Sequence, residues 1–139
     1  MMYARQRGLT LVELMVVVAV MAIIASVAYP LYTAQVQKTR RADAKIAVEM
    51  VAMAQERFYT INGGYAAILS TLQVSTDIQG GASNEGYYTI ANPVLSGGGQ
   101  GFTVTATRSA SGAQATDACI SFTIDHTGQK ISNPATGCW

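Results

Sequence analysis

Hydrophobic residues form one long run near the start of the chain. From Leu14 to Tyr32 every residue is apolar or aromatic except Ser26 and Pro30, and a helix needs about 20 such residues to span a membrane. No glycine occurs from residue 9 to residue 61, so the pattern predicts one helix that continues well past the apolar run. At 1.5 Å per residue that helix would be about 80 Å long. Pro30 would remove one of its backbone hydrogen bonds and kink it.

The second half of this helix has an amphipathic pattern. Lys45 and Glu49 lie four residues apart and are expected to pair, and Asn62 followed by Gly63 predicts a helix end. Apolar residues recur at helical spacing and predict a buried stripe, made of Ile46, Met50, Met53, Ala54, Phe58 and Ile61.

After residue 62 the pattern alternates with a period of two, which is typical of strands with one buried face. Residues 102–107 and 120–124 alternate in this way, and 87–91 and 130–132 are expected to be shorter strands. In the second strand Ile120, Phe122 and Ile124 would face the core, with Cys119 on the other side. A small antiparallel sheet packed on the amphipathic helix half makes an α+β domain with one core.

Composition narrows the possible functions. The chain has 139 residues, of which only 17 are charged, and a net charge of +1, so a strongly basic nucleic-acid binder does not fit. One His and two Cys cannot supply the ligands of a usual zinc or iron–sulfur site. We expect no metal and no cofactor.

Three local features suggest chemistry but have simpler interpretations. Lys38, Arg40, Arg41 and Lys45 could contact DNA phosphates, but a charged run on a helix is usually a solvated face. The glycines of 97–101 precede a predicted strand, where a phosphate-binding loop would precede a helix. His126 lies in a predicted turn without a matched nucleophile.

The start of the chain resembles a type IV prepilin. The residues that carry the resemblance are Arg7, Gly8, Leu9, Thr10, Leu11, Val12, Glu13, Leu14, Met15, Val16 and Val17. In that family a membrane peptidase cuts after the glycine and methylates the new amine. The resemblance therefore makes Leu9 the first mature residue and Glu13 the fifth, with Pro30 at a position where the family often has proline. Leu9 departs from the usual phenylalanine.

Glu13 is also singled out by physical chemistry. A carboxylate within a lipid-embedded helix costs several kcal/mol unless it is paired. The simpler interpretation is an acid near the headgroup layer, stabilised by the positive start of the helix. The resemblance implies an assembly role, in which the acid meets the terminal ammonium of a neighbouring subunit.

The resemblance continues through residues 55–65 and into Cys119, Cys138 and Trp139, an ending most similar to minor pilins of the PilE type. Because this part of the chain would then lie in the periplasm, the two cysteines are expected to form a disulfide. Its loop of about 20 residues would stabilise the fold by roughly 3 kcal/mol.

The resemblance implies a leader at 1–8, a transmembrane and assembly helix half at 9–32, and a head at 33–139. The expected function is structural, not enzymatic: a minor pilin that helps to prime assembly of a type IV pilus. The chain would be a single-pass inner-membrane protein that later lies outside the cell in the filament.

Expected partners are other pilins, the prepilin peptidase and the inner-membrane assembly platform, with DNA a less favoured partner. Alternatives are a pseudopilin of a type II secretion system, a DNA-uptake pilin, or a secretory signal peptide in place of the membrane span.

Overall fold

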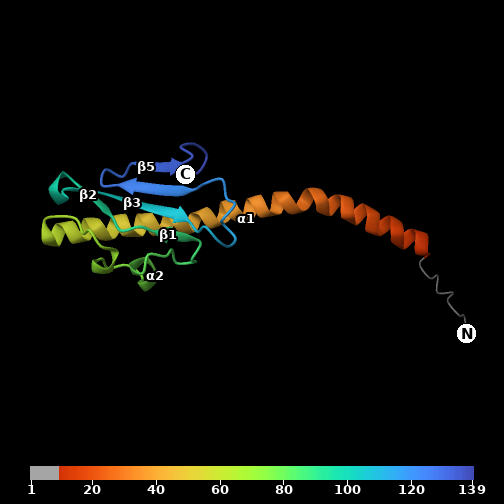
Figure 1. Ribbon diagram of the computed structural model, residues 1–139, viewed down its shortest axis with the longest axis horizontal. Helices are drawn as coiled ribbons and strands as arrows, with labels where there is room; N and C mark the ends of the chain where they lie inside the picture. The colour runs from red at the N-terminus through yellow and green to blue at the C-terminus, as the bar shows by residue number, and fades with distance from the viewer. Residues whose placement is uncertain (1–9) are drawn as a thin grey trace, which may run out of the picture. The chain divides into compact units, whose positions relative to one another are not determined.

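A computed structural model describes residues 10–139, which form two compact units, one ending at Gln35 and the other comprising Val36–Trp139 (Figure 1). We call the second unit the head. The predicted processing site, Gly8 and Leu9, lies outside the described residues.

One helix, α1 (Leu11–Asn62, 52 residues), belongs in part to each unit. Thr10 caps its start, since its Oγ1 accepts a hydrogen bond from the Glu13 N–H at 3.2 Å. Gly63 follows its end with a φ of +72° and donates its N–H to the Tyr59 carbonyl at 2.8 Å. The predicted helix and its glycine stop are therefore confirmed.

The first part of α1 exposes its apolar side chains, including Leu11 (76%), Ile23 (68%) and Leu31 (67%). By length and composition α1 can cross a membrane. The helix continues through Pro30, and the hydroxyl of Thr33 donates to the Pro30 carbonyl at 2.9 Å.

The head is built on the second part of α1, but the predicted buried stripe is wrong at three positions. Ile46, Met53 and Ile61 are 51%, 54% and 80% exposed. The face that packs against the sheet is displaced around the helix and consists mainly of small residues, namely Asp43, Ala44, Ala47, Val48, Val51, Ala54 and Gln55. The sheet supplies the large side chains of this core, Tyr88, Phe102 and Phe122, so small helix residues allow the two layers to approach closely.

The sheet has five antiparallel strands in the order β1-β3-β4-β5, with β2 pairing beside β1 on the same edge of β3. Their bounds are β1 (Tyr88–Ile90), β2 (Val94–Ser96), β3 (Gly101–Arg108), β4 (Ser121–Asp125) and β5 (Lys130–Asn133). In the centre Val104 pairs with Ile124 and Ala106 with Phe122. The α+β prediction is confirmed, and β2 is a strand that the pattern missed.

A loop with two short helices connects α1 to the sheet: η1 (Leu69–Thr71) and α2 (Thr76–Gln79). It places Leu69, Leu72 and Ile78 in the core. The buried amide of Gln55 fixes the start of this loop, because it donates to the Ala66 carbonyl at 2.7 Å and accepts from the Ala66 N–H at 2.8 Å. Both polar groups are thereby satisfied away from water.

Candidate functional site

Glu13 is the only charged residue between residues 9 and 34. It lies in the first turn of α1 and is exposed among aliphatic side chains. Among residues 10–139 no side chain pairs with its carboxylate. The positive end of a helix stabilises an acid at this place, and no cationic side chain of residues 10–139 neutralises it.

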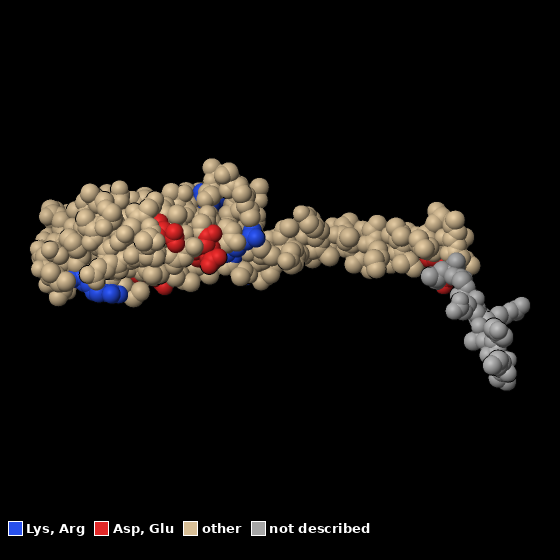
Figure 2. All heavy atoms as spheres, turned by 90° about the horizontal axis from the view of Figure 1, so that it is seen from below, with Lys and Arg blue, Asp and Glu red and all other residues tan. Residues whose placement is uncertain are grey.

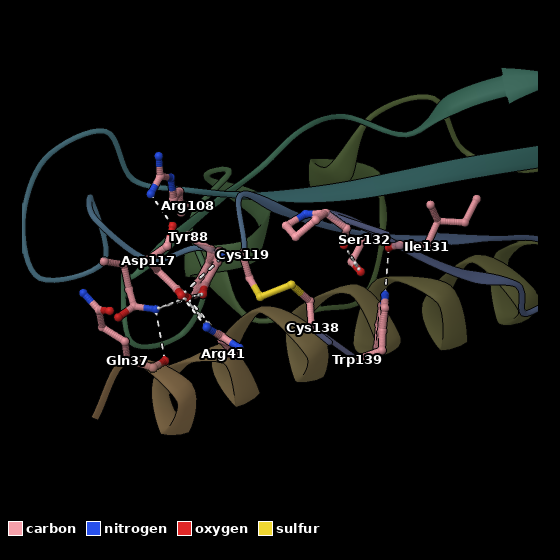
Figure 3. Close-up of a disulfide and its surroundings, with 12 residues drawn as sticks. Gln37, Arg41, Tyr88, Arg108, Asp117, Cys119, Ile131, Ser132, Cys138 and Trp139 are labelled. Atoms are coloured by element: carbon pink, nitrogen blue, oxygen red, sulfur yellow. Dashed lines mark hydrogen bonds and ion pairs between the residues drawn. A yellow bond between two sulfur atoms is a disulfide. The ribbon is translucent and has the colours of Figure 1, made fainter. Parts of the chain in front are cut away.

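The cysteines that the sequence singles out form the disulfide Cys119–Cys138, with Cα atoms 5.7 Å apart (Figure 3). Both are buried, at 2% and 3% exposure. The prediction that Cys119 faces away from the core is wrong, and so is the burial of Ile120, which is 39% exposed. The reason is that β4 begins only at Ser121, so the strand alternation does not extend back to these residues.

The disulfide fixes the C-terminal residues over the sheet. The indole N–H of Trp139 donates to the carbonyl of Ile131 in β5 at 2.8 Å. The Trp139 and Phe122 rings pack edge to face, with their centres 5.6 Å apart. The tail thus covers part of the edge of the sheet.

A buried acid, Asp117, organises the loop between β3 and β4 (Figure 3). Its carboxylate accepts three hydrogen bonds from Arg41 of α1, the shortest from Nη2 to Oδ1 at 2.6 Å. It also accepts from the Tyr88 hydroxyl at 3.4 Å, from Gln114 Nε2 at 3.0 Å and from the Cys119 N–H at 3.3 Å. This network ties the loop to the helix.

The charges in this network determine its pKa values. Burial alone would raise the pKa of the Asp117 carboxyl, but the hydrogen bonds and charge of Arg41 and the Cys119 N–H outweigh burial and lower it below its ordinary value. The hydrogen bond to Asp117 raises the pKa of Arg41. Burial raises the pKa of the Tyr88 hydroxyl. Asp117 is therefore charged and Tyr88 neutral at neutral pH.

Sequence reasoning did not find this network. The charge pattern places Arg41 in a solvated basic run and predicts no partner for Asp117. The available signal was an acid two residues before a cysteine in a region with only six charges.

The basic residues 38–45 do not form one free cationic patch. Arg41 forms an ion pair with Asp117, and the Arg40 guanidinium lies 4.7 Å from the centre of the Tyr87 ring. The Lys45 Nζ lies over the Phe122 and Trp139 rings, 5.7 and 5.8 Å from their centres. Burial lowers the pKa of the Lys45 ammonium.

Glu49 forms its ion pair with Lys130 of β5, with Nζ and Oε1 2.6 Å apart. The predicted Lys45–Glu49 pair is therefore wrong. The reason is that β5 brings Lys130 to Glu49, whereas Lys45 packs over the Phe122 and Trp139 rings.

The head carries balanced charge. Seven Lys or Arg and seven Asp or Glu lie between residues 36 and 139. On the face shown in Figure 2 the cationic side chains appear in separate groups, with acidic groups between them. Within residues 10–139 no cluster of His, Cys, Asp and Glu could hold a metal ion.

The glycine loop and His126 have structural roles. Gly97, Gly98 and Gly99 form the short helix η2 (Gly97–Gly99), all with positive φ, in the hairpin between β2 and β3. The His126 N–H donates to the Phe102 carbonyl at 3.0 Å, as expected for a turn residue.

Two protein-family models match the chain. The model described as "Type IV minor pilin ComP, DNA uptake sequence receptor" matches residues 30–123, and that of the prokaryotic N-terminal methylation motif matches residues 3–29. No curated protein matches the chain.

Solved structures of pilins resemble the chain. A type IV pilin from Shewanella oneidensis shares 28% identity with a TM-score of 0.53, over 74% of this chain and 97% of that one. The non-core minor pilin PilV from Neisseria meningitidis has the same fold, with 14% identity and a TM-score of 0.53 over 71% of this chain and 88% of that one.

The helix and sheet are those of a pilin, and the N-terminal motif and apolar helix fit a membrane-anchored subunit that later lies in a pilus. The pilin family and its fold are structural. Since the ComP model covers more than half of the residues, the chain belongs to the type IV minor pilin family.

Proposed function

We propose that this minor pilin enters the filament through residues 9–32, and that Glu13 binds the terminal ammonium of a neighbouring subunit during assembly. The observation that carries the proposal is an acid without a partner among the described residues, placed in an otherwise apolar stretch of helix. A cation supplied by a neighbour would neutralise it as the helix leaves the membrane, where an unpaired charge is costly. The methylation motif supports a processed, free amine at Leu9.

The test replaces Glu13 by Val in the full-length chain. Membrane insertion is expected to be unchanged, because the substitution removes a charge from an apolar segment. Incorporation into sheared filaments is expected to fall at least tenfold. Glu85→Val is the matched control, since Glu85 is an exposed acid of the head. Normal incorporation of Glu13→Val would show that the acid is merely tolerated.

We further propose that the chain primes assembly together with other minor pilins, after processing by the prepilin peptidase and through the inner-membrane assembly platform. The family match supports a minor subunit. Deletion should then sharply reduce piliation and twitching while the major subunit accumulates in the membrane. Quantitative mass spectrometry of sheared pili should find this chain well below the major pilin. Lost protein secretion with normal filaments would instead indicate a pseudopilin.

DNA uptake is a second candidate function, because the matching family is described as a DNA uptake sequence receptor. Exposed Lys38 and the neighbouring Arg40, which stacks on Tyr87, are the cations of the basic run that are not bound to an acid or buried against the core. They supply at most a small phosphate-binding surface, and the balanced charge of the head opposes strong binding.

This candidate is tested by duplex binding at 50 and 200 mM salt. If DNA binds here, Lys38→Ala and Arg40→Ala should each reduce, by about one, the magnitude of the slope of the logarithm of the binding constant against the logarithm of the salt concentration. Arg57→Ala is the matched control because Arg57 lies outside the run. Equal effects of all three variants, or no binding at 50 mM, would remove DNA from the list of partners.

A further inference from the structure

A groove of about 470 Å³ lies on the head between the end of α1 and the loop that follows it. We call it the Arg57 groove. Its lining is Ala54, Arg57, Phe58, Thr60, Ile61, Asn62, Thr71 and Gln73. Neither Glu13 nor the Asp117 network is part of it.

The groove has an apolar wall that the head leaves uncovered. Ile61 is 80% exposed, and Phe58 is only half-buried against the core. Exposed apolar side chains that line a groove together are typical of an interaction surface.

The charge of the groove indicates what it accepts. Arg57 is its only charged lining residue, and no acid lines it. Among residues 10–139 the Arg57 guanidinium forms no ion pair or hydrogen bond. A free guanidinium beside an apolar wall is complementary to a carboxylate carried on an apolar segment, which it can bind through two parallel hydrogen bonds.

A second cavity on the head lacks this complementarity. Arg40, Asp43 and Glu85 line it together, so charges of both signs are already present. The lining of this second cavity therefore does not favour a positively or a negatively charged partner.

We propose that the Arg57 groove docks an apolar, carboxylate-bearing segment from the head of a different pilin subunit. The inference rests on the proposed function, because filament packing would hold another pilin beside this chain. The high effective concentration of such a neighbour raises the occupancy of a groove that offers only one cation and a few apolar contacts.

The test places a photoactivatable cross-linking residue at Ile61 of the full-length chain in piliated cells. Val94 of β2 is the matched control, since it is 69% exposed and lies outside the groove. The expected result is a cross-link from Ile61 to another pilin, at least fivefold stronger than from Val94. Arg57→Glu should reduce that cross-link at least fivefold, and Arg57→Lys, which keeps the charge but not the two parallel hydrogen bonds, should give an intermediate cross-link.

The outcomes separate this inference from the proposed function. If the chain is absent from sheared filaments, the proposed function fails before the groove is at issue. If the chain is incorporated but Ile61 cross-links to lipid, to a second copy of this chain, or to nothing, the docking inference is overturned alone. A cross-link to a pilin that Arg57→Glu leaves unchanged overturns the assigned role of the cation. Thiol labelling in each variant checks that the disulfide, and hence the head, is intact.

Discussion

Replacing Asp117 by Asn tests whether the buried carboxylate stabilises the head. The side chain of Asp117 is fully buried, and that of Arg41 is 15% exposed. Oδ1 accepts from Arg41 and the Cys119 N–H, and Oδ2 accepts from Arg41, Tyr88 and Gln114. Wherever the amide nitrogen of Asn is placed, it faces donors instead of acceptors, while Arg41 loses its counter-charge.

The expected loss follows from these contacts. Removing one partner of a buried ion pair costs about 3 to 5 kcal/mol, because the other charge stays buried without compensation. Water can reach the partly exposed Arg41, so we expect the lower figure, about 3 kcal/mol. That is a large part of the roughly 5 to 15 kcal/mol by which a typical domain is stable.

The assay is equilibrium urea unfolding of the full-length chain in detergent, with the disulfide oxidised. With a denaturant slope of about 2 kcal/mol per molar, the midpoint should fall by about 1.5 M. Asp125→Asn is the matched control, because Asp125 also accepts several hydrogen bonds but lies at the end of β4, where a surface turn begins. A midpoint shift for Asp117→Asn no larger than the control's would refute the reasoning.

The lowered pKa of Asp117 predicts a pH dependence of the same difference. A carboxyl whose pKa is lower in the folded state stabilises that state above its unfolded pKa of about 3.9, and the contribution is lost as the pH falls through the folded value. The midpoint difference between wild type and Asp117→Asn should therefore be constant from pH 7 to 5 and should shrink below about pH 4. A difference that grows on acidification would contradict this.

Three further predictions concern other parts of the chain. Cys119→Ser should destabilise the head by about 3 kcal/mol because a loop of about 20 residues is no longer closed, and reduction of the wild type should reproduce the loss of urea stability. Gly101→Ala should cost about 1 kcal/mol, since a Cβ there would lie 2.5 Å from the Ser96 Oγ, which must rotate away, and 3.1 Å from Cε1 of the His126 ring; an unchanged melting temperature would contradict this. Intact mass of filament subunits should show that residues 1–8 are lost and that Leu9 carries one methyl, whereas a retained leader would contradict the expected processing after Gly8.

The sequence alone was sufficient for α1 and for β1, β3, β4 and β5, but not for β2 or for the short helices η1 and α2. A glycine-free stretch followed by Gly63 predicted α1 and its end, because helix propensity and the left-handed stop are local properties. The alternation of apolar and polar residues predicted β3 and most of β4, because this pattern is also a local property. The prepilin-like start depends on consecutive residues and was likewise readable.

Which face of α1 is buried could not be read from the pattern. Both the Ile46 stripe and the alanine-rich face through Ala47 and Val51 have helical spacing, and the larger side chains favour the wrong one. The bulky Phe102 and Phe122 of the sheet select the small face, because close packing requires small residues opposite large ones. The exposed apolar residues of the Arg57 groove are a consequence of that selection.

Electrostatic partners were also decided by tertiary structure. Lys45 and Glu49 satisfied the local rule for an ion pair, yet Glu49 pairs with Lys130, 81 residues away. Arg41 and Asp117 meet across 76 residues. Sequence spacing gives charge partners only within a few residues of each other, whereas these pairs exist because the sheet and its loops bring distant charges onto the helix.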